Sequence, residues 1–402
     1  MSESTLTFPF VDLRSRLRPE RLERLARRNG QTEQTSARRS IIEEVAGWLW
    51  RAQEATGDGC VAQFYHLQTG WLSVDGETTG AAVNTMLALA EILPDRDLIE
   101  RAIRLGKASM KHDEMGGRSL PKIVNSEDIA AAARAVLGWT ALYEQTNDPE
   151  FKNEAVTAGK RLVRFQENGL MDHPVTVPHK SIAAWALWRL FCLHPNKTFR
   201  ITADSLGNSV AGNSTPEGYL RGCIGANGAD PSLIHIAQAL HGLLEAGLLS
   251  GYRSWIVAAH RGAQRLFEFH RQKGTLAGRY GPDWRPDHSF NCMAGCAQTA
   301  LLWLRLYQYG WPDTYFNAAT QVARFITSTI DTANPDPGIR GGIRAGYPLW
   351  VDYHPLAYSA TAARLALDVF LLEKKLSPTG KRYRRLQIRR PAEGGYPEGG
   401  IR

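Results

Sequence analysis

Residues 126–166 read SEDIAAAARAVLGWTALYEQTNDPEFKNEAVTAGKRLVRFQ and predict two helices of different character. The first segment, up to Gln145, is apolar almost all round, which is typical of a helix buried on every side. The second, from Pro149, carries apolar and charged residues with a helical period, which suits a helix with one face in water. Because only a short turn separates them, the two segments predict an antiparallel helical hairpin.

The same two helix types recur along the chain about every 45–60 residues, a spacing that indicates a helical repeat. Amphipathic segments lie at residues 37–56, 96–113, 149–166, 252–272 and 313–331, and apolar segments at 77–93, 126–145, 179–193, 231–247, 291–310 and 353–374. The missing amphipathic helix is expected within 197–213, where the pattern is weak. We therefore predict an all-α fold, an (α/α)6 toroid of six hairpins with apolar inner and amphipathic outer helices. An open solenoid is the alternative, but its ends usually need polar caps, and the last apolar helix has none.

The connections between the helices are unequal in length. Those from an inner helix to the next outer helix are short, whereas those from an outer helix to its inner partner are long and rich in Gly, His, Asp, Arg, Trp and Tyr. In a closed toroid all six long loops emerge at one end, over the N-termini of the inner helices. Long loops on a rigid scaffold commonly carry function, so this end is the candidate site.

Charge and composition divide the chain into three parts. Residues 1–40 hold nine arginines against five acids, and residues 374–402 hold nine Lys or Arg against two acids, so the remaining 30 basic and 33 acidic residues give residues 41–373 a net charge of −3. We expect a basic N-terminal extension over 1–38, the toroid over 39–376 and a disordered basic tail over 377–402. The body is not a basic nucleic-acid platform, although the tails could contact an anionic membrane surface.

The remaining composition favours a cytoplasmic protein with reduced thiols. Five scattered cysteines do not form a disulfide framework, and the first residues lack the apolar core of a signal peptide. No apolar stretch reaches the roughly 20 residues that cross a bilayer. The oligomeric state cannot be predicted from the chain.

Two Gly-rich turns that lead into inner helices resemble the terpenoid cyclase and protein prenyltransferase α/α toroids. They are TGWLSVDGETTGAAVNTMLAL at 69–89 and GGIRAGYPLWVDYHPLAYSATAARLAL at 341–367. The resemblance covers roughly residues 40–375 as architecture. It implies a zinc-binding role for His354, but the Asp-x-Cys pair and the D-x-D-D motif of these families are absent. The C-terminal turn also resembles uncharacterised toroid proteins associated with bacterial surface-polysaccharide synthesis.

The fifth long loop, GRYGPDWRPDHSFNC, has the highest density of Asp, Arg, His and aromatic residues among the six. It contributes Tyr280, Asp283, Asp287 and His288 as candidate catalytic groups, with Asp283 and Asp287 as the in-loop carboxylate pair that glycoside hydrolysis would need. The structural alternative is that Asp287 caps the following helix while Asp283 pairs with an arginine. The last long loop adds Asp352, Tyr353 and His354 as further catalytic candidates.

Candidate substrate-binding residues are expected at the same end of the toroid, where the six long loops emerge. Arginines can bind a carboxylate, sulfate or phosphate in a bidentate manner, tryptophans can stack on a sugar, and histidines at inner-helix starts suit acid–base catalysis or a metal site. The set comprises Trp71, His179, His235, Arg279, Trp284, Arg285, Arg340, Arg344 and Trp350. Many of these are as well explained by capping or loop bracing. No metal site is defined, no cofactor is expected, and zinc has only weak support.

These patterns favour a carbohydrate-active enzyme, a hydrolase, lyase or epimerase that acts on an acidic or surface polysaccharide or its precursor. An isoprenoid-handling enzyme is the first alternative, and it predicts an apolar central cavity where the carbohydrate enzyme predicts a polar one. The second alternative is a non-catalytic toroid that binds a glycan or a protein in polysaccharide biosynthesis. A saccharide or another small molecule is the expected ligand in the favoured case.

Overall fold

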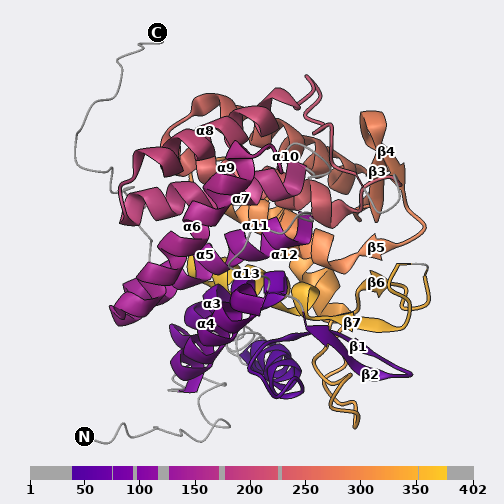
Figure 1. Ribbon diagram of the computed structural model, residues 1–402. Helices are drawn as coiled ribbons and strands as arrows, with labels where there is room; N and C mark the ends of the chain where they lie inside the picture. The colour runs from indigo at the N-terminus through magenta and orange to yellow at the C-terminus, as the bar shows by residue number, and fades with distance from the viewer. Residues whose placement is uncertain are drawn as a thin grey trace, which may run out of the picture.

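Twelve helices in the described part of the chain form a closed double ring (Figure 1). The computed structural model describes residues 39–74, 76–93, 97–115, 126–171, 177–224, 229–351 and 353–377. The inner helices are α3 (Gly76–Ala90), α5 (Ser126–Thr146), α7 (Val177–Leu193), α9 (Leu233–Ser250), α11 (Met293–Gln308) and α13 (Ala360–Leu376). The outer helices are residues 39–54, α4 (Asp97–Met115), α6 (Pro149–Glu167), α8 (Lys197–Gly212), α10 (Arg253–Lys273) and α12 (Asp313–Ser328).

The ring closes because each inner helix packs on the next, and α13 packs back on α3. The predicted (α/α)6 toroid is therefore confirmed. Residues 197–213, where the amphipathic pattern is weak, do contain the outer helix that the sequence pattern left unassigned, α8. Its N-cap is Asn196, whose side chain accepts a hydrogen bond from the Thr198 amide at 2.9 Å. A local cap therefore marks a helix whose apolar pattern is poor.

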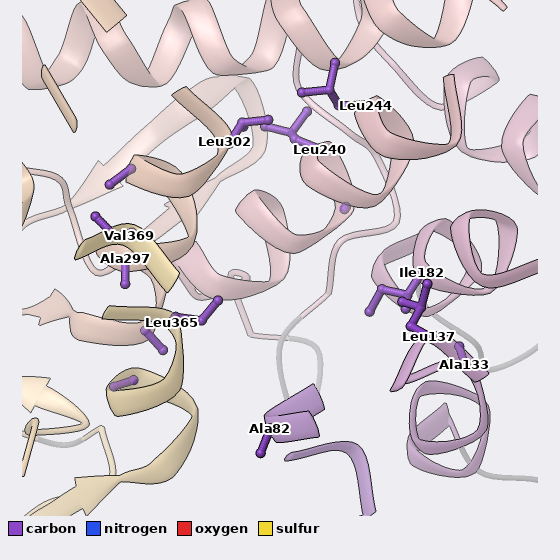
Figure 2. Close-up of a cluster of buried hydrophobic side chains, with 14 of the residues drawn as sticks. Ala82, Ala133, Leu137, Ile182, Leu240, Leu244, Ala297, Leu302, Leu365 and Val369 are labelled. Atoms are coloured by element: carbon purple, nitrogen blue, oxygen red, sulfur yellow. The ribbon is translucent and has the colours of Figure 1, made fainter. Parts of the chain in front are cut away.

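Burial follows the two helix types. On the outer helix α12 the buried positions are Tyr315, Ala318, Ala319, Val322, Ala323 and Ile326, a single stripe at helical spacing. On the inner helix α9 nearly every residue is buried, and 89% of this helix lies inside the structure although it is long and apolar enough to cross a membrane. Figure 2 shows small and branched side chains at the contacts between the inner helices. Ala133 of α5 and Leu365 of α13 are examples from two different contacts.

Short strands lie in the long loops, a feature that the helical pattern did not predict. β1 (Ala62–His66) and β2 (Gly70–Val74) form a hairpin, and β7 (Ala357–Ser359) pairs antiparallel with β1. This sheet joins the first hairpin to the last, as the adjacent indigo and yellow strands of Figure 1 show. The pairs β3 (Arg279–Gly281) with β4 (Arg285–Asp287), and β5 (Asn291–Cys292) with β6 (Gly346–Tyr347), brace the fifth and sixth long loops.

The expected terminal extensions at 1–38 and 378–402 lie outside the described residues, so their disorder and membrane contact stay predictions. Cytoplasmic localisation likewise stays a prediction.

Candidate functional site

A cavity of about 180 Å³, here called the mouth cavity, lies at the end of the ring where the inner helices begin. It is lined by the first turns of α3, α7 and α9, by β1 and by the loop before β7. Its polar and aromatic lining residues are Gln63, Phe64, Glu77, Thr78, Arg134, His179, His235, Gln238, Gln298, Tyr353, His354, Ser359, Thr361 and Arg364. The lining of this cavity is thus largely polar.

Glu77 is the carboxylate at the centre of this site. Its Oε1 accepts a hydrogen bond from Gln238 Nε2 at 2.9 Å and lies 3.4 Å from Nε of Arg134. Burial acts to raise the pKa of Glu77, but the charges of Arg134 and His179 and these hydrogen bonds outweigh it, so the pKa is lowered. Glu77 also lies in the first turn of α3, where the helix dipole favours a negative charge. It is therefore held ionised.

His235 lies in the first turn of α9, and one of its two ring nitrogens is held by a neighbouring serine. Its Nδ1 lies 3.2 Å from Oγ of Ser232, the residue that precedes the helix. This contact leaves Nε2 as the nitrogen available to a ligand. Burial and the neighbouring His179 lower the pKa of His235 below its ordinary value, and Glu77 only partly opposes them. His235 is therefore mostly neutral at pH 7.

His354 faces the same cavity from the loop before β7. Its ring stacks on Phe64 of β1, with centroids 4.7 Å apart and planes at 28°, and it meets Tyr353 edge-on at 4.9 Å. Partial burial by these rings lowers the pKa of His354. Burial also raises the pKa of Tyr353, whose Oη lies 3.3 Å from Sγ of Cys292. Of these two groups, only His354 could take a proton at neutral pH.

The fifth-loop catalytic candidates lie outside the lining of the mouth cavity. Tyr280 is fully buried, its hydroxyl accepts a hydrogen bond from the Ala277 amide at 3.1 Å, and burial raises its pKa. Asp287 Oδ1 accepts a hydrogen bond from the Ser289 amide at 2.9 Å, and the hydrogen bonds of the Ser289 side chain and amide together lower the pKa of Asp287. Asp283 and His288 are exposed. This loop therefore places its polar residues in local structural contacts or in solvent.

The tryptophans and arginines of the predicted binding set also have identifiable neighbours. Trp71 packs on Trp48 at 5.1 Å, and buried Trp284 donates a hydrogen bond to the Glu217 carbonyl at 3.0 Å. The remaining contacts pair Arg285 with Asp230, Arg340 with Glu44, Arg279 with the Phe290 ring and Arg344 with the Tyr347 ring. Trp350 is 76% exposed, and Asp352 lies outside the described residues.

Of the residues predicted from sequence, the mouth cavity brings together His179, His235, Tyr353 and His354. The sequence analysis missed Glu77 and four polar residues further inside the inner helices, namely Arg134, Gln238, Gln298 and Arg364. A signal for these four was present, because each is a polar residue within a largely apolar helical segment. A polar group inside a helix that is buried all round must face another polar group or a cavity.

No group of three or more His, Cys, Asp or Glu side chains within the described ranges is arranged to hold a metal ion. Cys292 of β5 and Cys296 of α11 are both buried, and burial raises the pKa of both thiols. Both are therefore protonated at neutral pH, a state that disfavours metal binding.

A second cavity, here called the distal cavity, lies along the inner helices towards their C-terminal ends and has a volume of about 410 Å³. Arg134, Gln298 and Arg364 line both cavities. The distal cavity also contains an ion pair between α9 and α11, in which Arg305 donates to Glu245 at 2.5 and 2.8 Å. His241 lies beside this pair, with its Nε2 3.3 Å from Glu245 Oε1, and its Nδ1 lies 2.8 Å from Nε2 of Gln298.

The fold and the polar mouth cavity define the class of protein as an (α/α)6 toroid with a candidate small-molecule site over the inner-helix N-termini. No protein-family model matches the sequence, and no curated protein matches it. Solved structures do match the fold.

Three similar structures are carbohydrate enzymes. Cellobiose 2-epimerase from Bacillus thermoamylovorans has a TM-score of 0.65 at 12% identity, covering 84% of this chain and 99% of its own. An unsaturated glucuronyl hydrolase from a Bacillus species, described as responsible for glycosaminoglycan degradation, has a TM-score of 0.66 at 15% identity, with coverages of 86% and 100%. An α-1,6-mannanase from a Salegentibacter species has a TM-score of 0.58 at 13% identity, with coverages of 83% and 98%. At these identities the similarity establishes the toroid fold.

Proposed function

We propose that the protein is a carbohydrate-active enzyme of the epimerase type, which moves a proton at the carbon next to a sugar carbonyl. The observation that carries this proposal is the pair of imidazoles, His235 and His354, lining one small polar cavity. The pKa of each is lowered by burial. Imidazoles are the most common proton-transfer groups in enzymes that work near neutral pH.

In the proposed reaction the open-chain sugar binds with C2 between the two imidazoles. A neutral imidazole takes the proton from C2, the electrons of that C–H bond form a C1=C2 double bond, and the carbonyl oxygen gains negative charge. The second imidazole, carrying a proton, delivers it to the other face of C2, and the carbonyl forms again. The number of protons is balanced, since one histidine gains the proton that the other loses.

Arg134 and Arg364 supply positive charge beside this reaction. Both are buried, at 7% and 6% exposure, and both line the mouth cavity. A fixed cation in a site of low dielectric stabilises the oxyanion that forms when C2 loses its proton. Glu77 holds Arg134 in place and balances its charge when the site is empty.

Hydrolysis is less well supported by this lining. Glycoside hydrolysis usually needs two carboxyl groups on either side of the scissile bond. Glu77 is the sole carboxylate among the described residues that line the mouth cavity, and it is already engaged by Arg134 and Gln238. Sugar epimerases and glycoside hydrolases both occur among the similar solved structures, so the choice between them rests on the lining of the cavity.

The polar lining also favours a sugar over an isoprenoid, which would require an apolar cavity. At about 180 Å³ the mouth cavity is smaller than the roughly 300–1,000 Å³ of pockets for drug-sized ligands. We therefore propose that it holds one reducing sugar unit, either free or at the end of an oligosaccharide. The same proposal includes the source of this sugar, which is an acidic or surface polysaccharide or its precursor.

The test is incubation of the protein in D₂O with reducing mono- and disaccharides, neutral and acidic, followed by NMR. Epimerisation places deuterium at C2 and yields the C2 epimer. His235→Asn and His354→Asn should each slow deuterium incorporation by about 10²–10⁴-fold, the usual contribution of a general acid or base. The matched control is His288→Asn, because His288 is exposed and outside the cavity lining.

Deuterium exchange that is equally fast in the wild type and in both site variants would reject the assignment. Cleavage of a glycosidic bond without exchange at C2 would show a hydrolase instead.

A further inference from the structure

The distal cavity is larger than the mouth cavity and is open to solvent, although it lies among the inner helices. Its volume is about 410 Å³, against about 180 Å³ at the mouth. Asn84 lies in the middle of the inner helix α3 and is nevertheless exposed, since it lines this cavity. An open space of this size between core helices has the dimensions of a ligand site.

Positive charge predominates in its lining. Five basic side chains line the distal cavity, from α5, α7, α11 and α13, against two acids: Arg134, Arg189, Arg305, Arg364 and Lys375, with Glu245 and Asp368. Both acids are engaged within the ring. Arg305 binds Glu245 through two nitrogens, while Asp368 Oδ2 accepts from Arg364 at 3.0 Å and its Oδ1 from Thr85 at 2.8 Å.

The carboxylate partners of the other cations lie outside the distal lining. Arg189 pairs with Glu144 and Lys375 pairs with Glu91, both in exposed ion pairs at the rim, and Arg134 pairs with Glu77 of the mouth cavity. Exposed pairs of this kind contribute little to stability, so they can be exchanged for a ligand at small cost. The lining of the cavity itself therefore carries more positive than negative charge, and an anion that enters it can replace a carboxylate partner that lies outside the lining.

An aromatic ring completes the lining. Trp185 of α7 is only partly buried, lines the distal cavity and packs on His241 with centroids 5.5 Å apart. Indole faces stack on the C–H face of a sugar ring, and arginines bind carboxylate or phosphate oxygens in a bidentate manner. We propose that the distal cavity is a second binding site, which takes a small sugar bearing an oxyanion, either a carboxylate or a phosphate.

Anion binding at the distal site does not require the proposed reaction at the mouth cavity, but the two cavities share lining residues. Arg134 lines both cavities and holds Glu77 on the mouth side. An oxyanion in the distal cavity would compete with Glu77 for this guanidinium. Occupancy of the distal site would therefore weaken the interaction that lowers the pKa of Glu77.

Binding is measured by isothermal titration calorimetry on the full chain, with glucuronate, glucose 6-phosphate and glucose as probes. We expect at least one of the two anionic sugars to bind about tenfold or more tightly than glucose, and the stronger one identifies the oxyanion. The double variant Arg189→Gln/Lys375→Gln should weaken that binding by about tenfold or more. Asn84→Trp should block it by filling the cavity.

Two controls separate this site from the mouth and from general charge effects. His354→Asn should leave the distal affinity unchanged, whatever it does to activity. Arg265→Gln removes one charge from a surface pair with Glu268 and should also have no effect. Failure of both anionic sugars to bind would overturn the proposal. It would also be overturned by binding that survives both distal variants or disappears in His354→Asn.

Discussion

His354 has a left-handed backbone conformation, with φ of 48°, that non-glycine residues seldom adopt. Two residues later Leu356 has a φ of 55°. Such conformations cost of order 1–3 kcal/mol each and persist where the surroundings hold them. Here the holding contacts are the stacking of the imidazole on Phe64 and the antiparallel pairing of β7 with β1. The structure thus fixes the imidazole against the wall of the mouth cavity.

The burial of His235 and His354 predicts a specific pH dependence. A lowered pKa means that each imidazole stays neutral to lower pH than free histidine, whose ordinary value is 6.5. The profile of kcat/KM should be bell-shaped, because one imidazole must be neutral and the other protonated. Since the pKa of both is lowered, the midpoints of both limbs should fall below pH 6.5. Phe64→Ala should expose His354 further and move the limb that His354 governs towards 6.5. An acid limb above 6.5 in the wild type would contradict the assignment.

Residue by residue, the sequence predicted the histidines better than their partners. His179, His235 and His354 could be predicted from the sequence because each lies where a long loop enters an apolar helix. Glu77 stands at such an entrance too, yet no partner is close to it in the chain. Its role depends on Arg134 of α5 and Gln238 of α9, 57 and 161 residues away. Contacts of that range become visible only when the ring is closed.

Two inner helices, α3 and α5, approach until their backbones touch. A Cβ on Gly138 would lie 2.7 Å from the Gly80 carbonyl oxygen, and a Cβ on Gly80 would lie 2.8 Å from the Ala135 nitrogen. Real Cβ atoms do not come this close to backbone atoms. These two glycines therefore set the spacing of the two helices, and with it the distance between Glu77 on α3 and Arg134 on α5.

Gly138→Ala should destabilise the protein by about 1–3 kcal/mol, the usual cost of an overpacked core. This outcome runs against helix propensity, by which alanine is preferred by about 1 kcal/mol. The matched control is Gly212→Ala in α8, where an added Cβ would meet nothing within 4 Å and should be neutral or slightly stabilising. Chemical denaturation measures both. Equal effects at the two positions would show that propensity, and not the backbone contact, decides stability.

At the level of elements, the sequence predicted the helices and the unequal loops but not the strands. The helices follow from a period of 3.6 residues that extends over several turns. β1 and β7 are five and three residues long, and they pair across nearly the whole chain. A strand this short has too little pattern of its own to be recognised. In the fifth loop part of the dense polar sequence serves a turn at Asp287 and the ion pair of Arg285 with Asp230, and the catalytic role predicted for this loop stays a prediction.

Ring closure couples the two ends of the described chain. The indole of Trp48 in the first outer helix donates a hydrogen bond to the Gly338 carbonyl at 2.7 Å, and Thr78 and Thr361 meet at 3.0 Å between α3 and α13. In an open solenoid each repeat contacts only its neighbours along the chain. Here the first and sixth hairpins are neighbours as well.

Trp48→Phe should therefore lower stability by about 1–3 kcal/mol, since the buried Gly338 carbonyl loses its donor. Amide hydrogen exchange measured by mass spectrometry should rise in the first hairpin and also in β7 and the start of α13. Trp139→Phe is the control, because Trp139 makes the same kind of bond to the Gly106 carbonyl within the second hairpin. Its effect should stay near α4 and α5. Exchange confined to the first hairpin in Trp48→Phe would show that closure carries little energy.

The pairing of β1 with β7 also has a consequence for biosynthesis. Phe64 belongs to the first of the six hairpins of the ring to be synthesised, and His354 precedes α13, the last helix of the ring. A nascent chain with five hairpins lacks His354, β7 and α13, however well those hairpins pack. The candidate catalytic imidazoles can therefore come together only after the sixth hairpin has docked, so that catalytic competence marks the end of folding of the whole ring.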